Sequence, residues 1–378
     1  MLIRKSSIVA LSVVSSWLVL QSSDRCAAQP PLQASFAIQP EDDLPEKQDE
    51  KSGKTIKRRA KSASPEVMEI RSQARRLKRF IKEDWPRRFL KAARSLPDIG
   101  PRTLYYDQAK QEVYSETEAE SLDAEHRAKL TKRTRDGAFY YKTKHGTPLA
   151  YSRAFDVLAA EGFEVRSGTK ILDYGYGSIG QLRMLAGLGA EAVGIEVDPE
   201  LRALYSYPGD QGAVKGAEGV VGSVRLVHGF FPADDEVRRS VGTGYDLFMS
   251  KNVLKNGYVH PARQVEKRKL LDLGVPEEEY VQTLFDMLNP GGYVLIYNIC
   301  PPEAAPDEPY IPWADGRSPF TKVQYESAGF RVLVFDRVDT EATREMAHLL
   351  GWDEGPYASV MEAGLFAWYT IVKKPDDK

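Results

Sequence analysis

The feature that most constrains the fold is the stretch from Lys170 to Asp198, which reads KILDYGYGSIGQLRMLAGLGAEAVGIEVD. A short apolar strand ends at Asp173, and a glycine turn, a helical segment and a second apolar strand ending at Glu196 follow. The glycines of the turn are Gly175, Gly177 and Gly180. They let the backbone approach a ligand, and the helix start offers free N–H groups. A carboxylate at Glu196 can accept both hydroxyls of a ribose, so this β-loop-α-β unit predicts a nucleoside-bearing ligand.

The glycine spacing alone also fits a dinucleotide fingerprint, with Glu196 about 20 residues after the first glycine. Asp173 discriminates between the two ligands. Its carboxylate would repel an anionic pyrophosphate and attract a cationic amino group. S-adenosylmethionine carries an α-amino group, a sulfonium and a ribose. Asp173 therefore favours S-adenosylmethionine over NAD, while a glycine-rich turn without a ligand is the alternative reading.

The downstream sequence predicts further strands at helix-plus-strand intervals. These apolar runs lie at 224–227, 245–250, 293–297, 330–335 and 365–372. A helix is expected from Tyr280 to Leu288, and Asn289-Pro290-Gly291-Gly292 closes it as a turn. The pattern predicts an α/β fold.

These motifs together resemble class I S-adenosylmethionine-dependent methyltransferases over about Tyr140 to Lys374. Asp173-Tyr174-Gly175-Tyr176-Gly177 matches the Asp-x-Gly-x-Gly loop of that family, and Glu196 matches its ribose-binding acid. The resemblance implies a doubly wound, Rossmann-like, seven-stranded sheet with an antiparallel C-terminal hairpin. It also implies S-adenosyl-L-methionine as cofactor, held by Asp173, Gly175, Gly177, Gly180 and Glu196.

Three positions depart from the family pattern. Ile179 stands where a further glycine is common, and Gly180 follows it. Phe230 stands after the third strand where an acid often contacts adenine, so adenine is expected to be held by stacking, with Phe230 as the candidate, or by backbone groups. Asp234 is a distant candidate for the acid. Ser250-Lys251-Asn252-Val253 is not an Asn-Pro-Pro-Tyr motif, which argues against methylation of a nucleobase or glutamine. Upstream, Tyr141 is a candidate to cover the cofactor, and packing is its alternative role.

Methyl transfer from a sulfonium is a displacement in which the protein mainly aligns the reacting atoms. A base is needed only where the nucleophile must lose a proton. The loop after the fourth strand is polar and long, and His260 is the leading base candidate in it, with Tyr258 behind it. Asn252 of the same loop is a further candidate for the catalytic site. A histidine beside a proline is also common at a surface turn.

The loop from Asn298 to Pro319 exceeds the usual length for a connection without a helix and is predicted to be a binding lid. Asn298, Trp313 and Arg317 are its candidate substrate contacts. A proline-stiffened surface loop is the alternative.

The sequence predicts four segments: a signal peptide or signal anchor over 1–28, a disordered linker over 29–64, a helical N-terminal extension over 65–138 and a methyltransferase domain over 139–378. Arg4 and Lys5 precede an apolar run of 13 residues from Ile8 to Leu20. This run is short for a membrane span, so export to the periplasm or extracellular space, or tethering by an uncleaved signal, is expected. An exported domain conflicts with a cofactor that is made in the cytoplasm. Ser64 and Pro65 are a helix-start signal, and the apolar spacing from Val67 to Ile81 predicts an amphipathic helix to about Asp84. Thr103 to Arg135 is expected to be helical.

Composition limits the partners. The net charge of −2 gives no overall attraction to nucleic acid, and the two cysteines cannot form a disulfide framework. The five histidines show no ligand-like pairing, so no metal is predicted. The basic N-terminal region is a candidate for peripheral membrane contact. The expected acceptor is a small or lipid-like molecule; the alternatives are an NAD-type oxidoreductase and a non-catalytic cofactor-binding or scaffold protein.

Overall fold

A computed structural model describes residues 63–354, 358, 361 and 364–377. The predicted signal segment over 1–28 and nearly all of the predicted linker lie outside these residues. No helix in the described part of the chain is long and apolar enough to cross a membrane.

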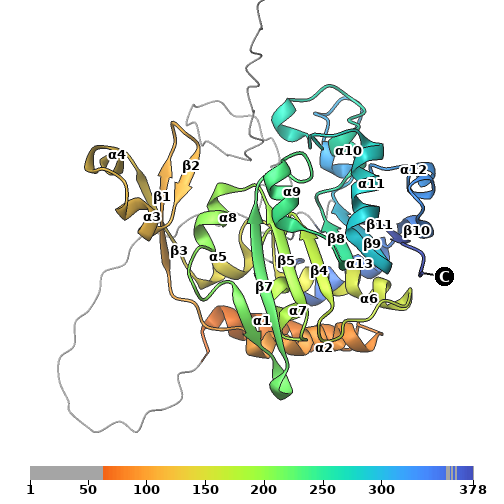
Figure 1. Cartoon of the computed structure of the whole chain (residues 1–378), viewed down its shortest axis with the longest axis horizontal. Helices are drawn as coiled ribbons and strands as arrows, with labels where there is room; N and C mark the ends of the chain where they lie inside the picture. Colours follow the sequence, from red (N-terminus) through yellow and green to blue (C-terminus); the bar gives the residue numbers. More distant parts are fainter. Residues whose placement is uncertain (1–62, 355–357, 359–360, 362–363, 378) are drawn as a thin grey trace, which may run out of the picture.

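An eight-stranded sheet lies at the centre of the molecule (Figure 1). Its strands follow one another in space as β10-β11-β9-β8-β4-β5-β7-β6. Their bounds are β4 Lys170–Tyr174, β5 Glu191–Glu196, β6 Gly212–Lys215, β7 Val221–His228, β8 Tyr245–Lys251, β9 Leu288–Cys300, β10 Arg331–Val338 and β11 Phe366–Lys373. The expected seven strands are confirmed, and β6 is an additional edge strand that pairs antiparallel with β7.

The last strand, β11, sets the topology apart from a dinucleotide fold, in which the added strands continue the parallel sheet. β11 inserts between β9 and β10 and runs antiparallel to both. The pairs β4–β5, β4–β8, β5–β7 and β8–β9 are parallel. The predicted antiparallel C-terminal hairpin is therefore confirmed.

Helices cover both faces of the sheet and enclose two apolar cores (Figure 1). One face carries α1 Pro65–Leu77, α2 Asp84–Ala92, α5 Gly137–Lys142, α6 Ser152–Ala160, α7 Gly180–Ala186, α8 Pro199–Leu204 and α13 Thr340–Leu349. The other face carries α9 Asp235–Val241, α11 Glu277–Met287 and α12 Lys322–Ser327. The short α10, Asn256–Val259, follows β8. The central strands are buried on both sides, as their continuous apolar runs predict.

The N-terminal helices follow the expected apolar spacing but break earlier than predicted. Ser64 caps α1 through its side chain and Pro65 occupies the first helical position. Val67, Ile70 and Leu77 are fully buried on its inner face. The prediction of a helix to about Asp84 is wrong, because α1 ends at Leu77 and α2 begins at Asp84. Pro86 lies in the first turn of α2. A proline is tolerated there because the backbone N–H that it lacks would have no acceptor within the helix.

The prediction of a helix over Thr103 to Arg135 is also wrong. This region forms a separate three-stranded antiparallel sheet of β1 Arg102–Asp107, β2 Glu112–Tyr114 and β3 Thr131–Arg135, in the order β2-β1-β3. Two short helices, α3 Glu116–Glu120 and α4 Ala124–Ala128, connect β2 to β3. β3 is mostly charged and exposed, so its sequence carries no alternating apolar pattern.

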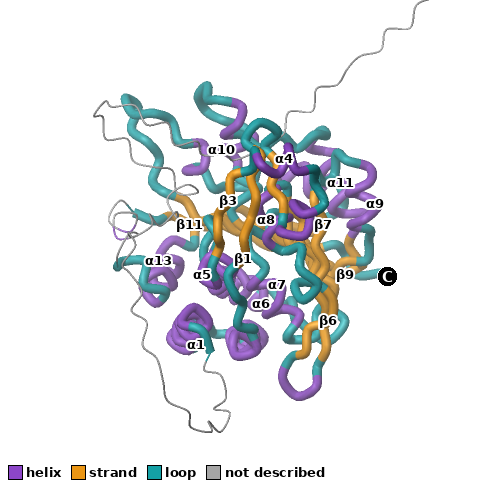
Figure 2. The backbone as a smooth tube through the Cα atoms, turned by 90° about the vertical axis from the view of Figure 1, so that its left-hand side faces the viewer, coloured by secondary structure: helices purple, strands orange, loops and turns teal. Residues whose placement is uncertain are grey.

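The small sheet packs against α8, beside the carboxyl end of β5 (Figures 1 and 2). Glu200 on α8 accepts a hydrogen bond from the Tyr106 hydroxyl at 2.7 Å and pairs with Arg135 at 2.6 Å. At the base of β1, Arg102 forms a buried two-bond pair with Asp210, at 2.6 and 2.9 Å. These contacts fix the N-terminal extension next to the strand that ends at Glu196.

Candidate functional site

The glycine loop, residues 175–180, connects β4 to α7 at the carboxyl edge of the sheet. Gly175 and Gly177 have φ values of +71° and +59°, a region that side-chain-bearing residues rarely adopt. Gly180 is the first residue of α7 and has no such φ; a Cβ there would lie 2.8 Å from Pro148 Cγ. Two glycines are thus required by backbone conformation, and the third is required by packing.

A segment ahead of β4, residues 143–148, lies directly on this loop; we call it the covering segment. The Thr143 hydroxyl donates to the carbonyl of Gly177 at 2.8 Å. A Cβ on Gly177 would lie 2.7 Å from Cβ of His145. Burial and the neighbouring Lys144 charge lower the pKa of His145 to about 4, so the ring is neutral at physiological pH. The side of Gly177 on which a Cβ would lie is therefore packed against His145.

Asp173 lies at the end of β4 with 0% of its surface exposed. Its carboxylate accepts hydrogen bonds from Nε2 of Gln181 at 3.0 Å and from the hydroxyl of Tyr151 at 3.4 Å. Burial raises its pKa to about 7, while the two hydrogen bonds and the nearby Lys251 charge act in the opposite direction. Asp173 is thus a buried acid that orients Gln181 and, when ionised, adds negative charge behind the glycine loop.

Glu196 ends β5, the strand next to β4, and is partly exposed. One carboxylate oxygen accepts from the N–H groups of Val197 at 2.8 Å and Asp198 at 3.3 Å. The other accepts only the N–H of Gly177 at 3.3 Å among the described residues, so it retains acceptor capacity. Burial raises the pKa of Glu196, and the neighbouring Asp198 charge acts in the same direction. Asp198 itself pairs with Lys144 of the covering segment at 2.5 Å.

The end of β8 completes the site from the other side of β4. Lys251 and Lys255 are both more than nine-tenths buried there. Lys255 donates from Nζ to the carbonyls of Ile299 at 2.8 Å and Trp313 at 3.2 Å. Val253 packs on the glycine loop, since a Cβ on Gly175 would lie 2.4 Å from its Cγ2. No role was predicted for Lys251 from the sequence. Its position at the end of a strand is the feature of the sequence that points to a place in the site.

Two of the predicted residues, Asn252 and Asn298, form hydrogen bonds that connect the segment after β8 to β9. Asn252 has a φ of +66°; its N–H donates to the side chain of Asn298 at 3.0 Å, and its own side chain accepts the N–H of Ile299 at 2.7 Å. Asn298 also donates to the carbonyls of Leu254 at 2.7 Å and Gly316 at 2.9 Å. This pairing joins the loops after β8 and β9. A direct role of either residue in chemistry stays a prediction.

The two base candidates lie in and after α10. Nε2 of His260 lies 3.0 Å from the carbonyl of Pro319 and 3.2 Å from Glu277, and 43% of its side chain is exposed. Tyr258 is buried, and the Lys255 ammonium lies 5.9 Å from its ring centre. His260 therefore lies at the outer side of the loop, and Tyr258 lies closer to the buried lysines. Their catalytic roles stay predictions.

The loop after β9 folds back onto α10. Asp315 accepts from Nδ2 of Asn256 at 2.7 Å and pairs with Arg317 at 2.7 Å. Trp313, in the short 3-10 helix Pro312–Ala314, is buried, and its ring N–H has no hydrogen-bond partner among the described residues. Arg317 is largely exposed. The structure thus brings Trp313 to the inside of the loop and Arg317 to its outside; their substrate contacts stay predictions.

The two remaining cofactor candidates differ in exposure. Tyr141 is fully buried; its hydroxyl donates to the carbonyl of Pro97 at 2.5 Å, and its ring lies 3.4 Å from where a Cβ of Gly180 would be. Phe230 follows Gly229 after β7 and is 40% exposed. The ring of Tyr141 thus packs against the glycine loop, whereas the ring of Phe230 is partly exposed to solvent. Binding by either residue stays a prediction.

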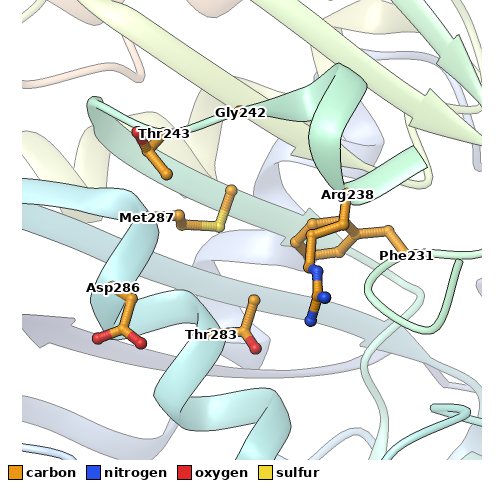
Figure 3. Close-up of a pocket in the computed structure, with 7 residues that line it drawn as sticks. All are labelled: Phe231, Arg238, Gly242, Thr243, Thr283, Asp286 and Met287. Atoms are coloured by element: carbon orange, nitrogen blue, oxygen red, sulfur yellow. The ribbon is translucent and has the colours of Figure 1, made fainter. Parts of the chain in front are cut away.

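A shallow pocket of about 200 Å³ lies elsewhere, between α9, α11 and the start of β8 (Figure 3). Its lining residues are Phe231, Arg238, Gly242, Thr243, Thr283, Asp286 and Met287. Arg238 pairs with Asp235 on its own helix at 2.6 Å. Within the described residues, no three His, Cys, Asp or Glu side chains group as metal ligands.

The strand order decides the fold, because β11 runs antiparallel between β9 and β10 while β4 ends in the Asp-x-Gly-x-Gly loop. The fold is that of class I methyltransferases. No family model matches the sequence, and no curated protein matches it.

Solved structures resemble the chain at low identity. An S-adenosylmethionine-dependent methyltransferase from Mesorhizobium loti is 15% identical, with a TM-score of 0.33, over 60% of this chain and 98% of that one. Phosphoethanolamine N-methyltransferase 2 of Haemonchus contortus is 14% identical, with a TM-score of 0.36, over 65% of this chain and 63% of that one. The [4+2]-cyclase SpnF is 16% identical, with a TM-score of 0.35, over 60% of this chain and 82% of that one. Function has to be argued from the site.

Proposed function

We propose that the chain is an S-adenosylmethionine-dependent methyltransferase whose cofactor binds at the glycine loop. One observation carries the proposal: Asp173, the last residue but one of β4, and Glu196, the last residue of the adjacent parallel strand β5, both adjoin a left-handed Gly-x-Gly loop. In open α/β sheets, ligands bind outside the carboxyl ends of the strands. A ligand with a ribose and a cationic end suits two acids better than a pyrophosphate does.

The residues around the loop fit this cofactor in three respects. Glu196 retains acceptor capacity for ribose hydroxyls on the oxygen that receives the Gly177 N–H. Asp173 adds negative charge on the side where a cationic amino group would bind. Nε2 of His145 and the hydroxyl of Tyr176 are buried beside the loop without hydrogen-bond partners among the described residues. Polar ligand groups would satisfy such atoms, which are otherwise costly to bury.

The bound cofactor would supply the methyl group, and the chain's residues would bind, orient and exclude water. The covering segment closes the loop from one side, and Val253 closes it from the other. The acceptor would then enter between the loops after β8 and β9, where Tyr258, His260, Trp313 and Arg317 lie. A small or lipid-like acceptor is part of this proposal, as is His260 as base.

Calorimetric titration of the full-length chain with S-adenosylmethionine, S-adenosylhomocysteine and NAD tests the proposal. We expect both adenosyl compounds to bind and NAD not to bind. Glu196→Gln should weaken binding of S-adenosylhomocysteine about 10- to 100-fold, because hydrogen bonds to a charged group contribute about 1.5–3 kcal/mol. Glu191→Gln, an exposed change at the start of the same strand, should leave binding unchanged. NAD binding would favour an oxidoreductase, and binding of none of the three would favour a scaffold.

A further inference from the structure

Three lysines lie at the carboxyl edge of the sheet, and two of them have partners that account for their burial. Lys144 pairs with Asp198 at 2.5 Å. Lys255 donates to two carbonyl oxygens. Lys251 differs: within the described residues its Nζ makes no hydrogen bond or ion pair, and the nearest aromatic contact is the ring of Tyr151, 5.1 Å away.

This lack of a partner is unusual for its position, because only 8% of Lys251 is exposed. A buried charge without a partner is costly, so such groups are normally paired. Burial and the Lys255 charge lower the pKa of Lys251 to about 8, while Asp173 raises it. With this pKa, Lys251 is mostly protonated at pH 7. Its ammonium therefore places a positive charge at the end of β8, within the candidate site.

Resting on the proposed function, we propose that Lys251 binds the carboxylate of a ligand amino-acid group, whose ammonium lies toward Asp173. The two residues come from neighbouring parallel strands: Asp173 is opposite Met249 on β8, two positions before Lys251. A cation and an anion held side by side complement an α-amino acid, which carries both charges on one carbon.

The charge of the surroundings favours a carboxylate over a phosphate. Lys144 is paired with Asp198, so among the described residues the remaining charged groups at this edge are the cations Lys251 and Lys255 and the acids Asp173 and Glu196. A doubly charged phosphate would therefore leave the site with a net negative charge. A zwitterionic amino-acid group brings one positive and one negative charge and adds no net charge to the site. Two ligands carry such a group: the cofactor at its methionine end, and an acceptor that is itself an amino acid.

The first experiment compares S-adenosylhomocysteine with its decarboxylated analogue by calorimetry on full-length wild type, Lys251→Met and Lys322→Met. Methionine keeps the length of the side chain and removes its charge. Lys322 is exposed on α12 and serves as the matched control. If the cofactor supplies the carboxylate, Lys251→Met should bind S-adenosylhomocysteine about 10- to 100-fold more weakly and the decarboxylated analogue as wild type does. Lys322→Met should match wild type with both.

The second experiment tests whether the acceptor, and not the cofactor, supplies the carboxylate. If wild type binds both compounds equally, free amino acids and their decarboxylated amines are titrated into the wild-type and Lys251→Met complexes with S-adenosylhomocysteine. An acceptor carboxylate predicts that wild type alone prefers the amino acids. Equal behaviour of Lys251→Met and wild type in both experiments would overturn the inference. A wild-type chain that binds neither adenosyl compound overturns the proposed function instead, and the amino-acid titration of the ligand-free chain then decides on Lys251.

Thermal unfolding of the ligand-free chain gives a readout that does not depend on ligand. Since the charge of Lys251 has no hydrogen-bonded partner within the described residues, its removal should leave the melting temperature unchanged or higher. Lys322→Met should leave it unchanged. A clear decrease in Lys251→Met alone would assign the lysine to the fold and contradict a ligand role.

Discussion

The hydroxyl of Thr143 donates a hydrogen bond to the carbonyl oxygen of Gly177 at 2.8 Å. The bond joins a residue in the left-handed region, with a φ of +50°, to a glycine in the same region, with a φ of +59°. The strained backbone of Thr143 on the covering segment is thus held to a glycine of the loop that adopts positive φ without strain. This contact, together with the Lys144–Asp198 pair, makes the covering segment part of the site.

Thr143→Val should loosen the covering segment without changing the shape of the side chain. The lost hydrogen bond is worth about 1 kcal/mol, which corresponds to about fivefold weaker binding of S-adenosylhomocysteine. Calorimetry measures this change. Thr131→Val, on the exposed face of β3, is the control and should bind as wild type does. Equal affinity of the two variants would mean that the covering segment does not stabilise the bound state.

Gly177→Ala should destabilise the chain and abolish cofactor binding, because the new Cβ would lie 2.7 Å from Cβ of His145. The strained φ adds about 1 kcal/mol to this clash. Gly212→Ala separates the two effects, since Gly212 has a φ of +88° and nothing within 4 Å of its Cβ position. Denaturant unfolding should show a larger loss for Gly177→Ala. Equal losses would show that backbone strain alone explains the effect.

The buried carboxyl of Asp173 should make stability depend on pH. Its folded-state pKa of about 7 lies above the usual value of 3.8, so the folded chain binds more protons between these values. The free energy of unfolding of the ligand-free chain should therefore fall as the pH rises from about 4 to about 7. Asp173→Asn should show a smaller fall, measured by denaturant unfolding across this window. An unchanged pH profile would mean that Asp173 titrates normally.

Asn298→Ala should cost about 2–4 kcal/mol of stability, because the carbonyls of Leu254 and Gly316 and the N–H of Asn252 lose a buried partner. Denaturant unfolding measures the loss. Gln282→Ala removes an exposed amide hydrogen bond and should cost little. A small loss for Asn298→Ala would contradict the structural role of its hydrogen bonds.

The sequence predicted the central sheet because each buried strand carries a short apolar run between turn residues. It did not predict β1 to β3. Edge strands such as β3 carry charges on exposed faces, so they lack the alternation that identifies a strand, and pairing with β1 stabilises them instead. The end of α1 was placed too late because the apolar spacing continues through Ile81, which is buried although it lies beyond the helix.

The candidate site was predictable where a motif fixes the backbone, as at Gly175, Gly177 and Glu196. It was not predictable where burial decides the role. The sequence cannot show that Lys251 is mostly buried without a hydrogen-bond partner among the described residues, or that Asn298 turns toward the loop carbonyls. Contacts across distant segments, such as Thr143 with Gly177, depend on packing of the whole chain.

The most direct measurement is a crystal structure of the full-length chain with S-adenosylhomocysteine. We predict ribose hydroxyls within hydrogen-bond distance of Glu196 and the amino-acid end at the carboxyl ends of β4 and β8. Ligand density away from the glycine loop, or a ribose that does not contact Glu196, would contradict the account.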